Sequence, residues 1–107
     1  MALSYSLDWF RDLLLTCDPN LTKYRGIGSE LCTVWRPQSP LTIDQDNAQH
    51  IYGWQVEVER RTKDDDDSIV ALLLEALLGC ERAEVSYTDA YDPTDGVHTH
   101  LFVCEVT

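Results

Sequence analysis

The feature that most constrains the fold is an alternating segment at residues 51–61, followed closely by an apolar segment with helical period at residues 69–80. In the first segment, aromatic and branched apolar residues alternate with polar ones, which predicts a strand with one buried face. The buried set is Tyr52, Trp54, Val56 and Val58, and the opposite set is Gln55, Glu57, Glu59 and Arg61. A one-sided strand leading into an amphipathic helix indicates a sheet packed by helices.

The second segment predicts a helix with a wide apolar surface. Asp67 or Ser68 can cap its free N–H groups, and Gly79 suits the left-handed position after its last turn. The expected buried stripe is Ile69, Leu72, Leu73, Ala76, Leu77 and Cys80. Because Leu74 and Leu78 widen this stripe, we expect the helix to be covered on two sides, by the sheet and by another helix or subunit.

The remaining patterns complete a single α+β domain over residues 1–107. The other expected elements are a helix at residues 7–17 and strands at residues 31–36, 83–88 and 97–106. Ser6 can cap the first helix, and Pro37 and Pro40 are expected to end the first strand before a long polar loop at residues 42–50. The order α-β-β-α-β-β predicts a mixed or antiparallel sheet packed by two helices on one face.

Charge is the most unusual bulk property of the chain. Nineteen acidic residues against eight basic ones give a formal net charge of −11. Nucleic-acid binding needs Lys and Arg to displace counterions from phosphates, so direct binding of DNA or RNA is not expected. Three interpretations stay open: an acidic surface for solubility, a face that docks a basic partner, and the wall of a passage through which DNA slides.

The sequence also bears on the compartment. No run of eighteen or more apolar residues occurs, and the N-terminus lacks the basic region of a secretory signal, so neither a membrane span nor export is expected. The four cysteines, Cys17, Cys32, Cys80 and Cys104, have wide spacings without a metal or redox motif. We expect free thiols, with Cys80 and Cys104 as small buried apolar residues.

Candidate chemical sites are weak. His98 and His100 fall on one strand face, but a metal would need further ligands such as His50 or Asp92, so exposed histidines beside a turn are the favoured interpretation. Asp89, Asp92 and Asp95 do not follow a calcium-loop spacing, and turn carboxylates commonly accept local N–H groups. Gly26-Ile27-Gly28 lacks the rest of a phosphate loop and predicts a turn. We expect no catalytic residue, no metal and no cofactor.

From Tyr52 to Val106 the chain resembles the phage tail-terminator family, also called tail completion or minor tail proteins. One likeness is the strand at residues 54–59 that runs through an acidic entry into a helix ending in Leu77-Leu78-Gly79. Another is the turn Tyr91-Asp92-Pro93-Thr94-Asp95-Gly96, similar to a tyrosine–aspartate–proline turn of that family. The last is the apolar closing strand at residues 98–106. The order of these motifs carries the resemblance, since each alone is common.

The resemblance implies a structural virion protein in the phage tail or neck, present in the host cytoplasm during assembly. It implies a homo-oligomeric ring, typically of six subunits, that caps the tail tube, joins it to the head connector and lets DNA pass without specific binding. Candidate acids lining the channel are Glu57, Glu59, Asp64, Asp65, Asp66 and Asp67. Candidate contacts with neighbouring subunits or partners are Gln38, Leu41, Asp44, Asp46, Tyr91, Asp92, Pro93, Asp95, His98 and His100.

Three alternatives share the same sequence features. A small acidic phage inhibitor that mimics nucleic acid would have the same size and charge, but would act as a monomer or dimer on a basic target. Another neck or head-completion protein would look much the same at the level of sequence. A metal-dependent enzyme would have to use His98, His100 and nearby acids.

Overall fold

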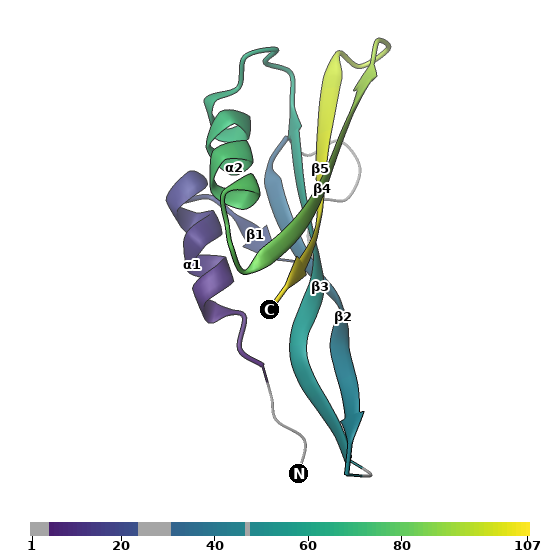
Figure 1. Cartoon of the computed structure of the whole chain (residues 1–107). Coiled ribbons are helices and arrows are strands. Elements are labelled where there is room, and N and C mark those ends of the chain that lie inside the picture. Colours follow the sequence, from purple (N-terminus) through teal and green to yellow (C-terminus); the bar gives the residue numbers. More distant parts are fainter. Residues whose placement is uncertain (1–4, 24–30, 47) are drawn as a thin grey trace.

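The computed structural model describes residues 5–23, 31–46 and 48–107. They form an α+β fold in which two helices cover one face of a five-stranded mixed sheet (Figure 1). In chain order the elements are α1 (Asp8–Cys17), β1 (Thr22–Lys23), β2 (Thr33–Gln45), β3 (Ala48–Thr62), α2 (Ser68–Leu78), β4 (Ala83–Asp92) and β5 (Val97–Val106). The predicted α+β class, with a mixed sheet and two helices, is confirmed.

The predicted element order was incomplete. The strands lie in the order β1-β2-β3-β5-β4, with β1 parallel to β2 and the other neighbours antiparallel. The missing element was β1, which pairs Thr22 and Lys23 with Val34 and Trp35. A strand of two residues has no alternation, so nothing in the sequence distinguishes it from a loop.

The hairpin of β2 and β3 differs most from the prediction. The strand does not end at Pro37, and residues 42–45 and 48–50 are strand rather than loop, because β2 continues to Gln45 and pairs with β3 up to Ala48. Among the residues that the structure describes, β1 pairs with Val34 and Trp35 and with no later residue of β2, so β2 is an edge strand beyond them and tolerates the prolines. A register shift after Pro37 leaves Gln38 without a cross-strand partner, as in a β-bulge.

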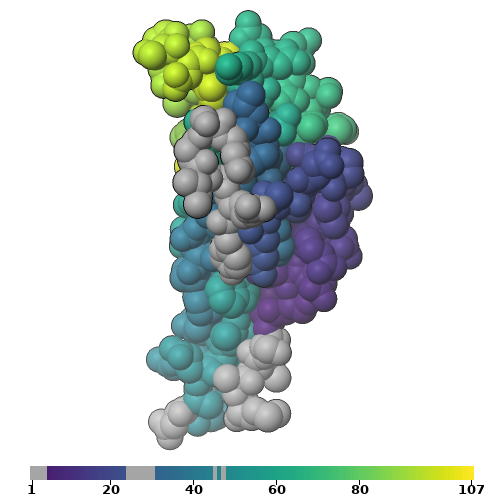
Figure 2. All heavy atoms as spheres, turned by 180° about the vertical axis from the view of Figure 1, so that it is seen from behind, coloured from purple at the N-terminus to yellow at the C-terminus, as the bar shows by residue number. Residues whose placement is uncertain are grey.

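The far part of this hairpin projects beyond the rest of the sheet. Pairing of β3 with β5 begins at Trp54, whose partner on β2 is Pro40, so residues 41–46 and 48–53 extend past the end of β5; we call them the arm. Figure 2 shows the molecule narrowing toward the arm, and its extents are 53 × 25 × 21 Å. Ile43 and Tyr52 on the arm are largely exposed, since the arm lies beyond the helices that cover the core.

The core lies between the helices and one face of β3 and β5. Val56 and Val58 are fully buried, as predicted, and lie opposite Cys104 and Phe102 of β5. The helix side of the core is contributed by Phe10 and Leu14 of α1 and by Leu73 and Leu77 of α2. Tyr52 does not join this face: it is half-exposed at a second register shift, where Leu41 pairs with Gly53 and Thr42 pairs with Ile51.

Both ends of α2 can be compared with the sequence. The Asp67 carboxylate accepts a 2.9 Å hydrogen bond from the N–H of Ile69, which confirms one of the two predicted caps. The predicted left-handed Gly79 is wrong, because its φ of −87° is right-handed. Glycine is still favoured there for another reason, since a Cβ would stand 2.8 Å from the carbonyl oxygen of Glu75.

An ion cluster joins both helices to the sheet. Arg60 on the helix-facing side of β3 donates from Nε to the Asp67 carboxylate at 2.9 Å, and its Nη1 lies 3.5 Å from Asp18 at the end of α1. It also donates to the buried hydroxyl of Thr33 at 3.3 Å. Burial raises the pKa of Asp67, but hydrogen bonds from Ile69 and Thr62 and the charge of Arg60 outweigh it, so the pKa lies below its usual value.

The cysteines are free thiols in unequal surroundings. Cys17 and Cys104 are buried, whereas Cys80, which we expected to be buried, is only partly so, as is Cys32. Burial raises the pKa of the Cys104 thiol to about 12 and also raises that of Cys17.

Thiol labelling should therefore separate into two classes. Because the thiolate is the nucleophile, Cys104 and Cys17 are expected to react with iodoacetamide at least about a hundredfold more slowly than Cys32 and Cys80 at pH 8. Mass spectrometry of labelled peptides over time measures each rate, and labelling in denaturant supplies the control in which all four react. Equal rates in the native protein would contradict this burial.

Candidate functional site

The face of the sheet turned away from the helices carries acidic side chains. Glu57 and Glu59 of β3 both lie there, and Arg36 of β2 approaches them at 3.6 and 3.7 Å. Further along the same face, Glu105 of β5 stands directly opposite Glu84 of β4. Like charges in direct cross-strand pairs destabilise a sheet, so this acidic face has a cost that the fold alone does not explain.

The other predicted acids lie elsewhere. Asp67 is buried against Arg60 on the helix side, with a side-chain exposure of 7%. Asp65 contacts His98, whose side chain belongs to the same helix-facing side of the sheet. Asp64 accepts a hydrogen bond from the N–H of Asp66 within the loop before α2. Glu57 and Glu59 are thus brought together on one sheet face, and the acids of residues 64–67 are not part of it.

The two histidines of β5 each have a partner. His98 Nε2 lies 2.6 Å from the Asp65 carboxylate, and His100 Nδ1 lies 2.7 Å from the Tyr87 hydroxyl. Burial lowers the pKa of His100, against the opposing charge of Asp89, and burial raises the pKa of Tyr87. The imidazole is therefore neutral and the phenol keeps its proton, so the two groups share a hydrogen bond between neutral partners. Both histidines are half-buried rather than exposed as expected.

This cluster does not assemble the ligands of a metal. His50 lies twelve residues along β3 from Thr62, the cross-strand partner of His98, which is about 40 Å of extended chain. The Asp92 carboxylate is used locally, because it accepts the N–H of Thr94 in the β4–β5 turn at 2.9 Å. Across residues 5–23, 31–46 and 48–107, no three His, Cys, Asp or Glu side chains are arranged to hold a metal ion.

The predicted partner contacts fall at two ends of the molecule. Gln38, Leu41, Asp44 and Asp46 belong to the β2–β3 hairpin, at or near the arm. Tyr91, Asp92, Pro93 and Asp95 belong to the β4–β5 hairpin, which lies at the opposite end in Figure 1. With a longest extent of 53 Å between such ends, the two sets cannot contact one small partner. The predicted contacts therefore belong to two separate surfaces.

A further apolar surface lies on α2. Leu72 and Leu78 are 45% and 59% exposed, so Leu72 does not join the buried stripe as predicted. Ala71 is also exposed, and Glu75 is the single charged residue of the helix. We call Ala71, Leu72, Glu75 and Leu78 the α2 face, in which Glu75 lies three residues from each leucine and is therefore flanked by apolar side chains. The exposed side of α1 carries Asp8, Arg11 and Asp12 together with Leu15, which is 37% exposed, so it is more polar than that of α2.

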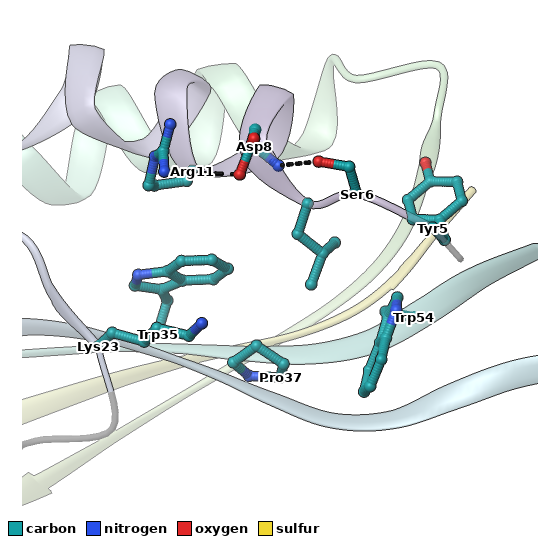
Figure 3. Close-up of a pocket in the computed structure, with 9 residues that line it drawn as sticks. Tyr5, Ser6, Asp8, Arg11, Lys23, Trp35, Pro37 and Trp54 are labelled. Carbon is teal, nitrogen blue, oxygen red and sulfur yellow. Dashed lines mark hydrogen bonds and ion pairs between the residues drawn. The ribbon is translucent and has the colours of Figure 1, made fainter. Parts of the chain in front are cut away.

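A hollow of about 350 Å³ lies between the start of α1 and the sheet. Figure 3 shows Trp35, Pro37 and Trp54 rising from the strands toward it. At its rim, Arg11 pairs with Asp8 at 3.5 Å, and the Lys23 ammonium lies 5.1 Å from the centre of the Trp35 ring. Its charged groups thus already have contacts within the chain, and the surface it offers is mainly aromatic.

Comparison with known proteins does not extend this description. No family model matches the chain, and no curated protein or solved structure matches it either. The tail-terminator resemblance therefore stays a prediction that rests on sequence motifs. Among the residues that the structure describes, no helix is long and apolar enough to cross a membrane.

Proposed function

We propose that this chain is a structural subunit of the tail-terminator type, which associates with its own copies into a ring that caps a phage tail tube and joins it to the head connector. The observation that carries the proposal is the α2 face. A helix that exposes Leu72 and Leu78 while its opposite side fills the core has more apolar surface than one subunit covers. Copies of the same chain cover such a surface when they close into a ring.

The open sheet face suits the wall of the channel. Glu57, Glu59, Glu84 and Glu105 share this face with two bases, Arg61 and Arg36, of which Arg36 approaches the first two glutamates. Repeated around a ring, these carboxylates would repel phosphates, so DNA would slide through without binding. Asp67 is removed from this role because Arg60 neutralises it inside the subunit.

The arm and the β4–β5 turn suit the contacts along the ring axis. They lie at opposite ends of an elongated subunit, so one can meet the tail tube while the other meets the connector. Ile43 and Tyr52 supply exposed apolar side chains on the arm, and Tyr91 does so beside the turn. In this proposal the protein is structural and performs no catalysis.

The proposal predicts a specific effect of charging the α2 face. The double variant Leu72→Lys with Leu78→Lys should change the free energy of unfolding by no more than about 0.5 kcal/mol, since both side chains are exposed and lysine is a good helix former. Its binding to tail tubes should fall at least about tenfold, because buried interface contacts are lost. Co-sedimentation with tubes assembled from the tube protein encoded beside this chain measures the binding.

Leu31→Lys serves as the matched control, because Leu31 is similarly exposed, at 48%, outside α2. It should sediment with tubes like the unchanged chain. Failure of the unchanged chain to sediment with tubes, together with tight binding to a basic nuclease, would replace the proposal by the acidic-inhibitor alternative. Equal loss in the α2 and Leu31 variants would remove the α2 face from the interface.

A further inference from the structure

The two edges of the sheet are built differently. Along β2 the edge is interrupted by Pro37, Pro40 and the bulge at Gln38, which are the devices that prevent pairing with another strand. Along β4 there is no proline, lysine, arginine or bulge, and all ten residues pair with β5 in unbroken register. The β4 edge is therefore long, regular and unprotected by such devices.

The backbone of β4 has unused pairing capacity. In an antiparallel ladder, every second residue directs its N–H and C=O groups away from the neighbouring strand. Within the part of the chain that the structure describes, the β4 backbone bonds outside the sheet lie at its two ends, where the N–H of Ala83 donates to the carbonyl of Cys80 and the carbonyl of Asp92 accepts from the N–H of Gly96. The side chains from Thr88 to Asp92 are exposed, so this edge is open to solvent.

The charges of this edge indicate which kind of strand can pair with it. Glu84, Asp89 and Asp92 lie on β4 without a basic residue, and Glu105 stands beside Glu84 on β5. A second copy of β4 would add like charges across the new ladder, which is unfavourable. A strand carrying Lys or Arg would instead compensate the Glu84–Glu105 pair, which is costly in the isolated subunit.

The side chains of β4 also indicate which residue pattern the partner strand needs. On the helix-facing side, Val85 and Tyr87 are half-buried and present apolar surface to a neighbour. On the opposite side, Glu84 is followed by Ser86 and Thr88. The complementary segment alternates apolar residues on the first side with basic residues on the second, because side chains of paired strands share a face.

We propose that the β4 edge binds an extended, basic segment of a partner protein, which adds to the sheet as a sixth strand. Main-chain hydrogen bonds hold the segment, and alternate apolar and basic side chains select it. This site is separate from the α2 face and does not depend on ring formation.

An end-blocked ten-residue peptide of alternating valine and lysine is the probe. With the full chain labelled with ¹⁵N, we expect chemical-shift changes concentrated in the amides of β4 and cross-peaks between peptide and β4 backbone protons. The peptide with two of its valines replaced by proline should bind at least about tenfold more weakly, because proline cannot extend the ladder. Equal binding of the two peptides, or shift changes outside β4, would overturn the proposal.

A matched pair of variants separates strand addition from general attraction between opposite charges. Glu84→Lys with Glu105→Lys should weaken binding on the order of tenfold, whereas Asp66→Lys with Glu75→Lys makes the same charge change at exposed positions away from this edge and should weaken it less than about twofold. Equal weakening in both pairs would show that the acidic surface as a whole attracts the peptide. Melting curves confirm that each variant is folded.

Discussion

Replacing Arg60 with alanine is expected to destabilise the fold by about 3–5 kcal/mol, the usual cost of removing one partner from a buried ion pair. The change leaves Asp18 and Asp67, whose side chains are 3% and 7% exposed, without their shared cation. It also removes the donor that contacts both the end of α1 and the start of α2. Urea denaturation at pH 7 measures the loss.

The control is Arg36→Ala, which removes an arginine that pairs with two glutamates on the open sheet face. Its side chain is 25% exposed and its ion pairs are long, so the expected loss is about 1 kcal/mol or less. Similar losses in the two variants would show that the Arg60 cluster contributes no more than a surface pair.

The Arg60 cluster also predicts a pH dependence. The pKa of Asp67 is lowered in the folded state, so its contribution to stability is present above its ordinary value of 3.8 and is lost as the pH falls through the lower folded value. In the Arg60→Ala variant the Asp67 carboxyl loses the hydrogen bond and charge of Arg60 and is instead easier to protonate. The stability difference between the two proteins should therefore shrink as the pH is lowered from about 7 toward 3.

Gly53→Ala is expected to cost about 3 kcal/mol or more, at the upper end for an overpacked site. An added Cβ would stand 2.2 Å from the carbonyl oxygen of Val106, which is backbone and cannot rotate away. To relieve the clash, the end of β5 must separate from β3 at the base of the arm. Faster amide hydrogen exchange at Val106 and Trp54 should accompany the loss of stability.

Gly96→Ala provides a comparison of a different kind. Gly96 has a φ of +68° in the β4–β5 turn, but no atom lies within 4 Å of an added Cβ, so only the backbone conformation is disfavoured. The expected cost is about 1 kcal/mol. If Gly53→Ala lowers the free energy of unfolding by no more than Gly96→Ala does, then β5 does not approach Gly53 as closely as described.

Much of the fold could be predicted because the spacing of apolar residues in the sequence agrees with the set of residues that are buried. The alternation around Val56 and Val58 and the stripe through Leu73 and Leu77 correctly indicated which faces are buried. The cap at Asp67 was predictable for the same reason, since an acidic residue precedes an apolar helix there. These signals are local, so they can be interpreted without knowing which distant residues become neighbours in the fold.

The features that could not be predicted depend on contacts between residues that are distant in the sequence. Pro37 and Pro40 indicated the end of a strand, but prolines are acceptable on an edge, and only the pairing of strands shows where the edge is. Arg60 falls on the apolar side of an alternating strand, which was the available sign of a buried ion cluster. Its partners, Asp18 and Asp67, are distant in sequence, so the cluster itself could not be predicted.

The candidate surfaces were predicted only in part. Glu57 and Glu59 share a face, as the alternation required, but Glu84 and Glu105 join them through a sheet order that the sequence did not specify. Leu72 was placed in the buried stripe, because a stripe as wide as that of α2 has no sharp boundary in the sequence. Its exposure is the observation on which the proposed assembly depends.

Electron microscopy of tail tubes mixed with the purified chain tests the proposed assembly most directly. A closed ring with an open central channel is expected at one end of each tube, and bare ends are expected when the Leu72→Lys and Leu78→Lys variant is used instead. Bare tube ends with the unchanged chain, at concentrations where it is folded, would contradict the proposed assembly.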